Sequence, residues 1–243
     1  MFSNLSEKDI ELILTSFGLS AWLALSSTII LILLCTPLAW FLARRNSWIK
    51  FLLQAVFCLP LVLPPSVLGF YLLVMFSPDS YLGHLWFTLT ETHLLFSFNA
   101  LLIASLVYSL PFVLQPLVSA FEQTGQEFMD LASTLGANSR QTFFGIVVPM
   151  NYSAYLIAFS LGFAHTLGEF GVVLLVGGNI AGETRVISIA IYEQVELMNY
   201  QLAHVMAMLI VLVSILLLLP VYALNGNLLR FPFHKPVSNE EKS

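Results

Sequence analysis

The sequence predicts an all-α polytopic membrane protein with about five transmembrane helices. Of its 243 residues, 58% are hydrophobic and only 9% are charged, whereas roughly 25% are charged in an ordinary soluble domain. The charges leave long uncharged runs at 12–43, 51–78, 92–121, 141–168 and 197–229. Each run exceeds the roughly 20 residues that a helix needs to cross a bilayer. The apolar character is continuous and lacks the period of two of barrel strands, so helices are expected.

The elements follow from these runs in order along the chain. We expect spans at 17–43, 51–76, 94–118, 151–177 and 201–224. Acidic residues precede the first run, which is also too long for a cleaved signal peptide, so this span is expected to remain in the mature protein. The predicted organisation is therefore a short outer segment (1–16), a transmembrane domain (17–224) containing a long connection (119–150), and a solvated tail (225–243).

The basic residues predict the orientation in the membrane. Those on one set of connections are Arg44, Arg45, Lys50, Arg140, Arg230, Lys235 and Lys242. Only Lys8 and Arg185 fall on the other set. Because short cytoplasmic loops carry an excess of Lys and Arg, this asymmetry places the N-terminus outside and the C-terminus in the cytoplasm.

Several functions are excluded or disfavoured by the residues themselves. The composition excludes a basic nucleic-acid-binding face, a disordered chain and a disulfide scaffold, and the two cysteines, Cys35 and Cys58, lie inside apolar runs. A phosphate-binding loop needs Gly-Lys-Ser/Thr at its end, but the only Lys that precedes a Ser is Lys242, which follows Glu241. The five histidines show no metal-ligand spacing. We therefore expect no cofactor or metal in this chain and no ATPase site.

The 128–149 segment of the long cytoplasmic connection has a helical pattern. Apolar residues recur at 128, 131, 132 and 135, which is the spacing of one helix face. Gly136 is expected to end that helix as a C′ glycine, and Asn138 with Gln141 resembles a capping box that opens a second one. An apolar helix face presented to the cytoplasm favours a partner groove. The alternative is an interfacial helix that only caps the bundle.

The second span contains three prolines, Pro60, Pro64 and Pro65. Each lacks an N–H and clashes with the preceding turn, so this span is expected to kink or partly unwind. Freed backbone groups in a bilayer are tolerated where they are buried in protein or line a wet cavity. The break is therefore a candidate pathway or gate element, and the alternative is a kinked packing helix.

Glu169 is the only carboxylate deep in an apolar region, near the outer end of the fourth span. An intramembrane ionisable residue is a functional-site hypothesis by default. Arg185 is the only cation of the late outer loop and its candidate partner. The competing interpretation, a structural or gating carboxylate, is favoured for an anion carrier because a bare carboxylate repels an anion.

Three stretches resemble a known family. The run from Asp130 to Ala137, continuing to Ile146-Val147-Val148-Pro149, resembles the EAA loop of bacterial ABC-importer permeases, with Asp130 where that family usually has Glu. The stretches Leu59–Gly69 and Leu167–Gly171 resemble molybdate importer permeases, and permeases for sulfate and thiosulfate share much of the pattern. The resemblance implies the type I ABC importer permease fold and a bacterial inner membrane location.

The resemblance also implies roles and partners. In that family the loop docks into an ATPase subunit, which implies ATPase coupling by Phe128, Asp130, Leu131, Ala132, Leu135, Gly136, Ala137, Ile146 and Pro149. The candidate pathway or gate residues are Pro60, Pro64, Pro65, Ser66, Gly69, Gly168, Glu169 and Gly171. Implied partners are two ATPase copies that bind ATP and Mg²⁺, a periplasmic oxyanion-binding protein and a second copy of the chain. No Lys or Arg lies inside a predicted span, so transit would rely on backbone N–H groups and hydroxyls such as Ser66.

The expected function is thus an ATP-driven molybdate permease subunit without its own ATPase site. A sulfate, thiosulfate or tungstate permease is the alternative within the class. A secondary transporter or channel is the alternative outside it, and such a carrier is expected to show inverted repeats and buried coupling charges. A membrane enzyme is poorly supported, since neither a serine hydrolase elbow nor paired carboxylates are visible.

Overall fold

The computed structural model describes residues 6–44 and 47–225, and the regular structure in this part of the chain is all helical, with no strand. The helices are α1 (Glu7–Ala43), α2 (Trp48–Val62), α3 (Pro65–Phe76), α4 (Tyr81–Thr90), α5 (Phe98–Thr134), α6 (Ser139–Thr142), the π-helical η1 (Phe143–Val147), α7 (Val148–Met150), α8 (Tyr152–Leu167), α9 (Gly171–Gly177), α10 (Ile187–Glu196) and α11 (Tyr200–Asn225).

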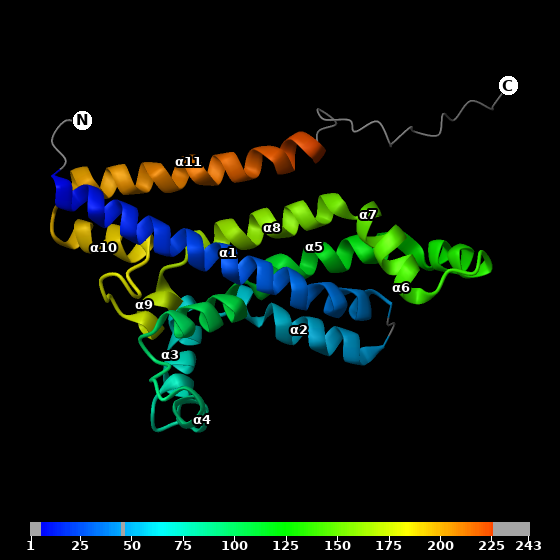
Figure 1. Ribbon diagram of the computed structural model, residues 1–243, viewed down its shortest axis with the longest axis horizontal. Helices are drawn as coiled ribbons and strands as arrows, with labels where there is room; N and C mark the ends of the chain where they lie inside the picture. Colours follow the sequence, from blue (N-terminus) through cyan, green and yellow to red (C-terminus); the bar gives the residue numbers. More distant parts are fainter. Residues whose placement is uncertain (1–5, 45–46, 226–243) are drawn as a thin grey trace.

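The longer helices lie roughly side by side along the long axis of the molecule (Figure 1). Helices α1, α5 and α8 make the most extensive mutual contacts and form the centre of the bundle. The C-terminal end of α5, α6 and α7 gather at one end, α9 and α10 lie toward the other, and α3 with α4 projects to the side (Figure 1). The all-helical prediction is confirmed.

The predicted number of about five spans is the upper limit of the three to five that the described helices allow. Three helices are long and apolar enough to cross a membrane: Glu7–Ala43, Phe98–Thr124 and Tyr200–Val221. Two bent pairs bring the number to five if each pair is one span. The first pair is α2 with α3, bent by 107°, and the second is Ser139–Met150 with α8, bent by 69°.

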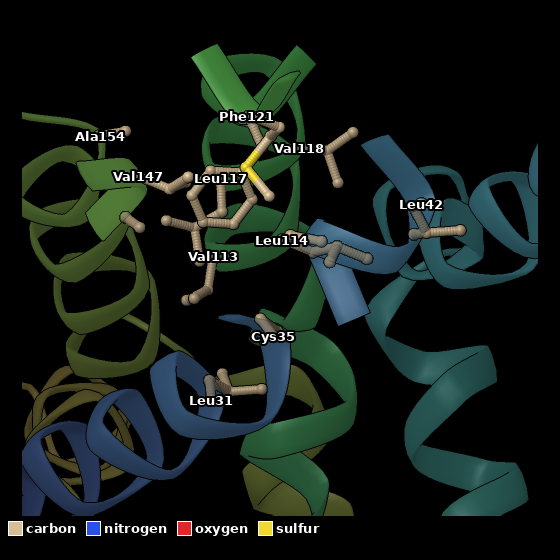
Figure 2. Packing of buried hydrophobic residues seen from close by; sticks show 13 residues of the cluster. Leu31, Cys35, Leu42, Val113, Leu114, Leu117, Val118, Phe121, Val147 and Ala154 are labelled. Carbon is tan, nitrogen blue, oxygen red and sulfur yellow. The ribbon is translucent and has the colours of Figure 1, made fainter. Parts of the chain in front are cut away.

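The central core joins α1, α5 and the start of the fourth span. Leu31 and Cys35 of α1 pack with Val113, Leu114 and Leu117 of α5 (Figure 2). Val147 and Ala154 approach from η1 and α8 (Figure 2). Burial of large aliphatic side chains contributes about 1.5–3 kcal/mol each, so this cluster holds α5 against its neighbours over several turns.

Several elements differ from the sequence prediction in their boundaries or were not predicted. Helix α1 begins at Glu7, well before residue 17, because Ser6 and Asp9 form a capping box. Helix α5 runs without interruption to Thr134, so the expected separate helix near 128–135 is its last part. The charges there mark where the chain leaves the apolar region, not where the helix ends. The fourth span stops at Leu167 and resumes as α9, and α4 and α10 were not predicted. The predicted tail from 226 onward lies outside the described residues.

Candidate functional site

The second span breaks between α2 and α3, as the prolines predict. Helix α2 ends at Val62, Pro64 is the N-cap of α3, and Pro65 is its first residue. Proline is favoured there because a first-turn N–H has no intrahelical partner. Pro60 lies inside α2 and is buried. The 107° bend therefore falls at the last two prolines.

Two glycines let the broken segments of the second and fourth spans approach closely. A Cβ on Gly171 would lie 2.9 Å from Pro65 Cβ. A Cβ on Gly69 would lie 2.8 Å from Leu175 Cδ1 and 3.2 Å from Val172 Cα. Any side chain at either glycine would force α3 and α9 apart. Gly69 thus lies in the contact between α3 and α9.

A cleft of about 500 Å³ lies beside both breaks. Its lining residues come from α3, α5, α8 and the start of α9, and they are Pro65, Tyr108, Ala164, His165, Gly168, Glu169, Phe170 and Gly171. Four sequence-predicted pathway residues are therefore brought together here: Pro65, Gly168, Glu169 and Gly171. The other four, Pro60, Pro64, Ser66 and Gly69, are not among the described lining residues.

Glu169 lies in the break between α8 and α9, residues Gly168–Phe170, and is only 4% exposed. Its Oε2 accepts a hydrogen bond from Ser105 Oγ of α5 at 3.0 Å. Its main-chain oxygen accepts one from Ser188 Oγ of α10 at 2.5 Å. Within the described residues, Oε1 is buried without a hydrogen-bond partner. Of the two carboxylate oxygens, only Oε2 is therefore held by a hydrogen bond within the described residues.

The sequence-based choice of Arg185 as the partner of Glu169 is wrong. Arg185 Nε donates to Asn179 Oδ1 at 2.6 Å, and its guanidinium lies 3.5 Å from Glu193 Oε2. The guanidinium is thus engaged by the loop between α9 and α10 and by α10 itself. The planar guanidinium carries several N–H donors, so it can contact two acceptors at once.

Helix α10 packs against the break between α8 and α9. The Tyr192 ring packs against Phe170, with centroids 5.0 Å apart. Tyr192 Oη donates a 2.7 Å hydrogen bond to Glu196 Oε1. That hydrogen bond and the charge of Glu196 raise the pKa of Tyr192. The phenol therefore remains a donor at physiological pH.

A row of polar side chains, three hydroxyls and one imidazole, joins α1, α5 and α8 next to the cleft, and we call it the polar seam. It consists of Ser27, Ser109, His165 and Thr166. Ser109 Oγ lies 2.8 Å from His165 Nδ1 and 2.9 Å from Thr166 Oγ1. Ser27 Oγ donates to Thr166 Oγ1 at 3.4 Å. Sequence reasoning missed this seam and treated the histidines as scattered. The available signal was Ser105 and Ser109, which lie four residues apart in an apolar span and so share one helix face.

The 128–149 segment exposes an apolar stripe, which we define as Phe128, Leu131, Leu135 and Phe144. These side chains are 44%, 61%, 82% and 69% exposed, respectively. The opposite face is buried: Met129, Ala132 and Val147 turn inward, and Met129 and Val147 join the central core. Of the four residues on the predicted helix face, Phe128, Leu131 and Leu135 are exposed, whereas Ala132 is buried on the inner side. Ile146 is half-buried and Pro149 is exposed, and the side chain of Asp130 lies outside the described part.

The two turn signals of this segment are confirmed. Gly136 has a φ of +84°, and the N–H of Ala137 donates to the carbonyl of Ala132 at 3.0 Å, which closes a Schellman motif. Asn138 and Gln141 exchange side-chain to backbone hydrogen bonds of 2.9 and 3.0 Å, which form the capping box. Asn151 then marks the 69° bend, where its Nδ2 donates to Thr124 Oγ1 and to the Val147 carbonyl.

The described lining of the cleft contains three ionisable side chains, Tyr108, His165 and Glu169. None of its described lining residues is Lys or Arg. Among the residues that the structure describes, no group of three His, Cys, Asp or Glu side chains could hold a metal ion. The cleft instead combines one carboxylate, one imidazole and one phenol with apolar walls.

Comparison with known proteins assigns the family. A family model for the "Binding-protein-dependent transport system inner membrane component" matches residues 35–231. The chain is 48% identical to the molybdenum transport system permease protein ModB of Azotobacter vinelandii, over 90% of this chain and 95% of that protein. It is 32% identical to the sulfate transport system permease protein CysT of Escherichia coli, over 78% of this chain and 68% of that protein.

The fold also matches solved structures. The crystal structure of a bacterial ABC transporter involved in the import of alginate superposes with a TM-score of 0.73, at 14% identity, over 94% of this chain and 86% of the matched chain. At that identity the likeness concerns the fold alone. The family match, the relatives and the multi-span bundle agree: this chain belongs to the inner membrane components of binding-protein-dependent transport systems.

Proposed function

We propose that this chain is the permease subunit of an ATP-driven importer that carries molybdate across the inner membrane. The observation that carries the proposal is the 48% identity, over nearly the whole of both chains, to a relative named a molybdenum transport permease. The cleft supports a conduit, because it lies between broken helices, where irregular backbone in membrane proteins lines pathways.

The exposed stripe of the 128–149 segment is the proposed docking surface for the ATPase subunit. Four large apolar side chains at the end of the bundle resemble the anchors by which an amphipathic helix occupies a groove. We assign contact to Phe128, Leu131, Leu135 and Phe144, with Asp130 in the last part of α5 and Gly136 and Ala137 at the turn that follows. Ala132, Ile146 and Pro149 shape the segment from its inner side and its end.

Energy and selectivity come from other subunits in this proposal. Two ATPase copies bind ATP and Mg²⁺, while a periplasmic oxyanion-binding protein captures the ion. Two copies of this chain enclose the pathway. The cleft residues Pro65, Gly168, Glu169 and Gly171 act in the gate, and Pro60, Pro64, Ser66 and Gly69 set the geometry of the adjoining break. ATP binding draws the docking segments together and opens the pathway outward, and hydrolysis resets it.

Uptake by the reconstituted complex tests this proposal. Proteoliposomes holding two copies of this chain and two ATPase subunits are supplied with the loaded binding protein outside and ATP inside. Molybdate uptake that requires ATP supports the proposal. Uptake that persists without ATP would instead identify a secondary transporter or channel.

Sulfate is the second candidate ion, because the chain is also 32% identical to a sulfate permease over 78% of its length. Molybdate, sulfate and tungstate are tetrahedral dianions, and a cleft lined without cations offers little to separate them. Competition of each unlabelled ion against labelled molybdate ranks them. Stronger competition by sulfate than by molybdate itself would reassign the substrate.

A further inference from the structure

Helix α5 joins the proposed docking surface to the wall of the cleft. It is one uninterrupted helix from Phe98 to Thr134. Near one end it carries Phe128 and Leu131 of the exposed stripe, and near the other it carries Ser105 and Tyr108. A displacement of the stripe along the helix axis is therefore also a displacement of Ser105.

Pro111 and Pro116 lie in the middle of α5, where each removes one backbone hydrogen bond. The central core braces this stretch. Val113, Leu114 and Leu117 are fully buried there against α1 and α8. The helix is therefore supported by side-chain packing where its own hydrogen bonding is weakest.

Ser105 connects α5 to the break between α8 and α9 by a hydrogen bond. Within the described residues, its hydroxyl is the only donor to the side chain of Glu169, at 3.0 Å, and the other carboxylate oxygen is buried without a partner. The main-chain oxygen of Glu169 is held separately by Ser188 of α10. The side chain of Glu169 is thus hydrogen-bonded to α5, while its backbone is hydrogen-bonded to α10.

We infer that Ser105 is a positioning residue for gating, which holds Glu169 in the cleft wall and passes movement of α5 to the α8–α9 break. The inference rests on the proposed function, because it requires a partner that moves the stripe. The adjoining contacts between α5 and α8 are also hydrogen bonds between side chains, Ser109 to His165 and to Thr166. Hydroxyls exchange partners during a small slide, whereas interdigitated aliphatic side chains must first separate.

The test compares Ser105→Ala with Ser105→Thr in the reconstituted complex. The ratio of ions transported to ATP hydrolysed is measured with whichever ion the wild-type complex imports. We expect Ser105→Ala to lower this ratio about fivefold or more, because a buried acceptor loses its only donor. Ser105→Thr keeps the hydroxyl and is expected to restore most of the ratio.

Ser26→Ala is the matched control. Ser26 is a serine of α1 whose hydroxyl, among the residues that the structure describes, bonds only carbonyls of its own helix, those of Trp22 and Leu23. The same truncation there is expected to leave the ratio unchanged. A normal ratio in Ser105→Ala, or an equal loss in Ser105→Ala and Ser105→Thr, overturns the inference.

A second readout does not depend on transport. In a background with both cysteines replaced by alanine, Ala164→Cys places a thiol in the cleft lining. Its maleimide labelling rate is compared between the nucleotide-free and the vanadate-trapped complex. The difference between these states is expected to shrink severalfold when Ser105→Ala is added, and an unchanged difference contradicts the inference. Failure of the wild-type complex to import any oxyanion would instead count against the proposed function.

Discussion

Gly162 of α8 lies directly against Val113 of α5, at the centre of the bundle. A Cβ built on Gly162 would be 2.6 Å from Val113 Cγ2 and 3.4 Å from Thr28 Cγ2 of α1. Real Cβ atoms do not approach other atoms as closely as the first distance. The absence of a side chain at this position therefore sets the separation of α5 and α8 beside the polar seam.

Replacing Gly162 by alanine is expected to destabilise the permease by about 1–3 kcal/mol, the usual cost of overpacking a dense core. Gly18→Ala is the control, because nothing lies within 4 Å of a Cβ there. Both variants gain the same helix propensity, so their difference isolates the clash. Thermal unfolding of the detergent-solubilised protein measures the effect.

Val113→Ala gives this prediction a sharper form. Adding it to Gly162→Ala removes the methyl group that clashes, so the double variant is expected to be more stable than the sum of the two single effects. Simple additivity would show that the two side chains do not compete for the same space.

Replacing Gly136 by valine is expected to disrupt the turn of the 128–149 segment. Its φ of +84° is a conformation that costs a β-branched residue about 1–2 kcal/mol or more. The Schellman hydrogen bond from Ala137 to Ala132 would be lost with it. The expected outcome is weaker co-purification of the ATPase subunit and slower transport. Gly145→Ala, in the same segment with open space around it, is expected to behave as wild type.

Polar substitution of the exposed stripe is expected to weaken ATPase binding without unfolding the permease. Leu135 is 82% exposed, so Leu135→Ser removes little buried area and is expected to change stability by less than about 0.5 kcal/mol. If Leu135 is an interface anchor, the dissociation constant for the ATPase subunit rises about tenfold. Leu89→Ser, at a 74% exposed leucine of α4, is the matched control. Equal dissociation constants for the two variants would show that the stripe is not part of the interface with the ATPase subunit.

The local signals were readable from the sequence, because each one acts through neighbouring residues. Pro64 and Pro65 predicted the break, Gly136 predicted the left-handed turn, and Asn138 with Gln141 predicted the cap. These effects depend on missing donors, backbone sterics or hydrogen bonds across three residues, none of which requires knowledge of the fold.

The side-chain contacts between different helices could not be predicted from the sequence. By charge alone, Arg185 was the expected partner of Glu169. In the structure, Glu169 accepts a hydrogen bond from Ser105, and Arg185 lies beside Glu193. Which serine of α5 meets which residue of α8 depends on helix rotation and on the close approach at Gly162. The rotation of each helix about its axis cannot be inferred from the pattern of residues in a single sequence.

The positions of the basic residues predict the orientation of the bundle in the membrane. Arg44 follows α1, Lys50 lies in the first turn of α2 and Arg140 lies in α6, and these elements meet at the end of the molecule that carries the 128–149 segment (Figure 1). The positive-inside rule predicts that this end is cytoplasmic. In the cysteine-free background, Ser139→Cys is expected to resist a membrane-impermeant maleimide in spheroplasts, while Asp79→Cys reacts. The reverse pattern would invert the topology.

The ion pair between Lys50 and Glu122 is expected to hold the start of α2 against α5. Lys50 Nζ lies 2.6 Å from Glu122 Oε1, and the two side chains are 14% and 41% exposed. Because the pair is partly exposed, Glu122→Lys is expected to cost about 1 kcal/mol, by placing two like charges together. Adding Lys50→Glu restores an attractive pair and is expected to recover most of that loss. At about 1 M KCl, where the screening length falls to about 3 Å, the differences in unfolding temperature should shrink. A double variant no more stable than Glu122→Lys alone would show that Lys50 packs at this position without pairing, and that α2 is held to α5 by apolar contacts.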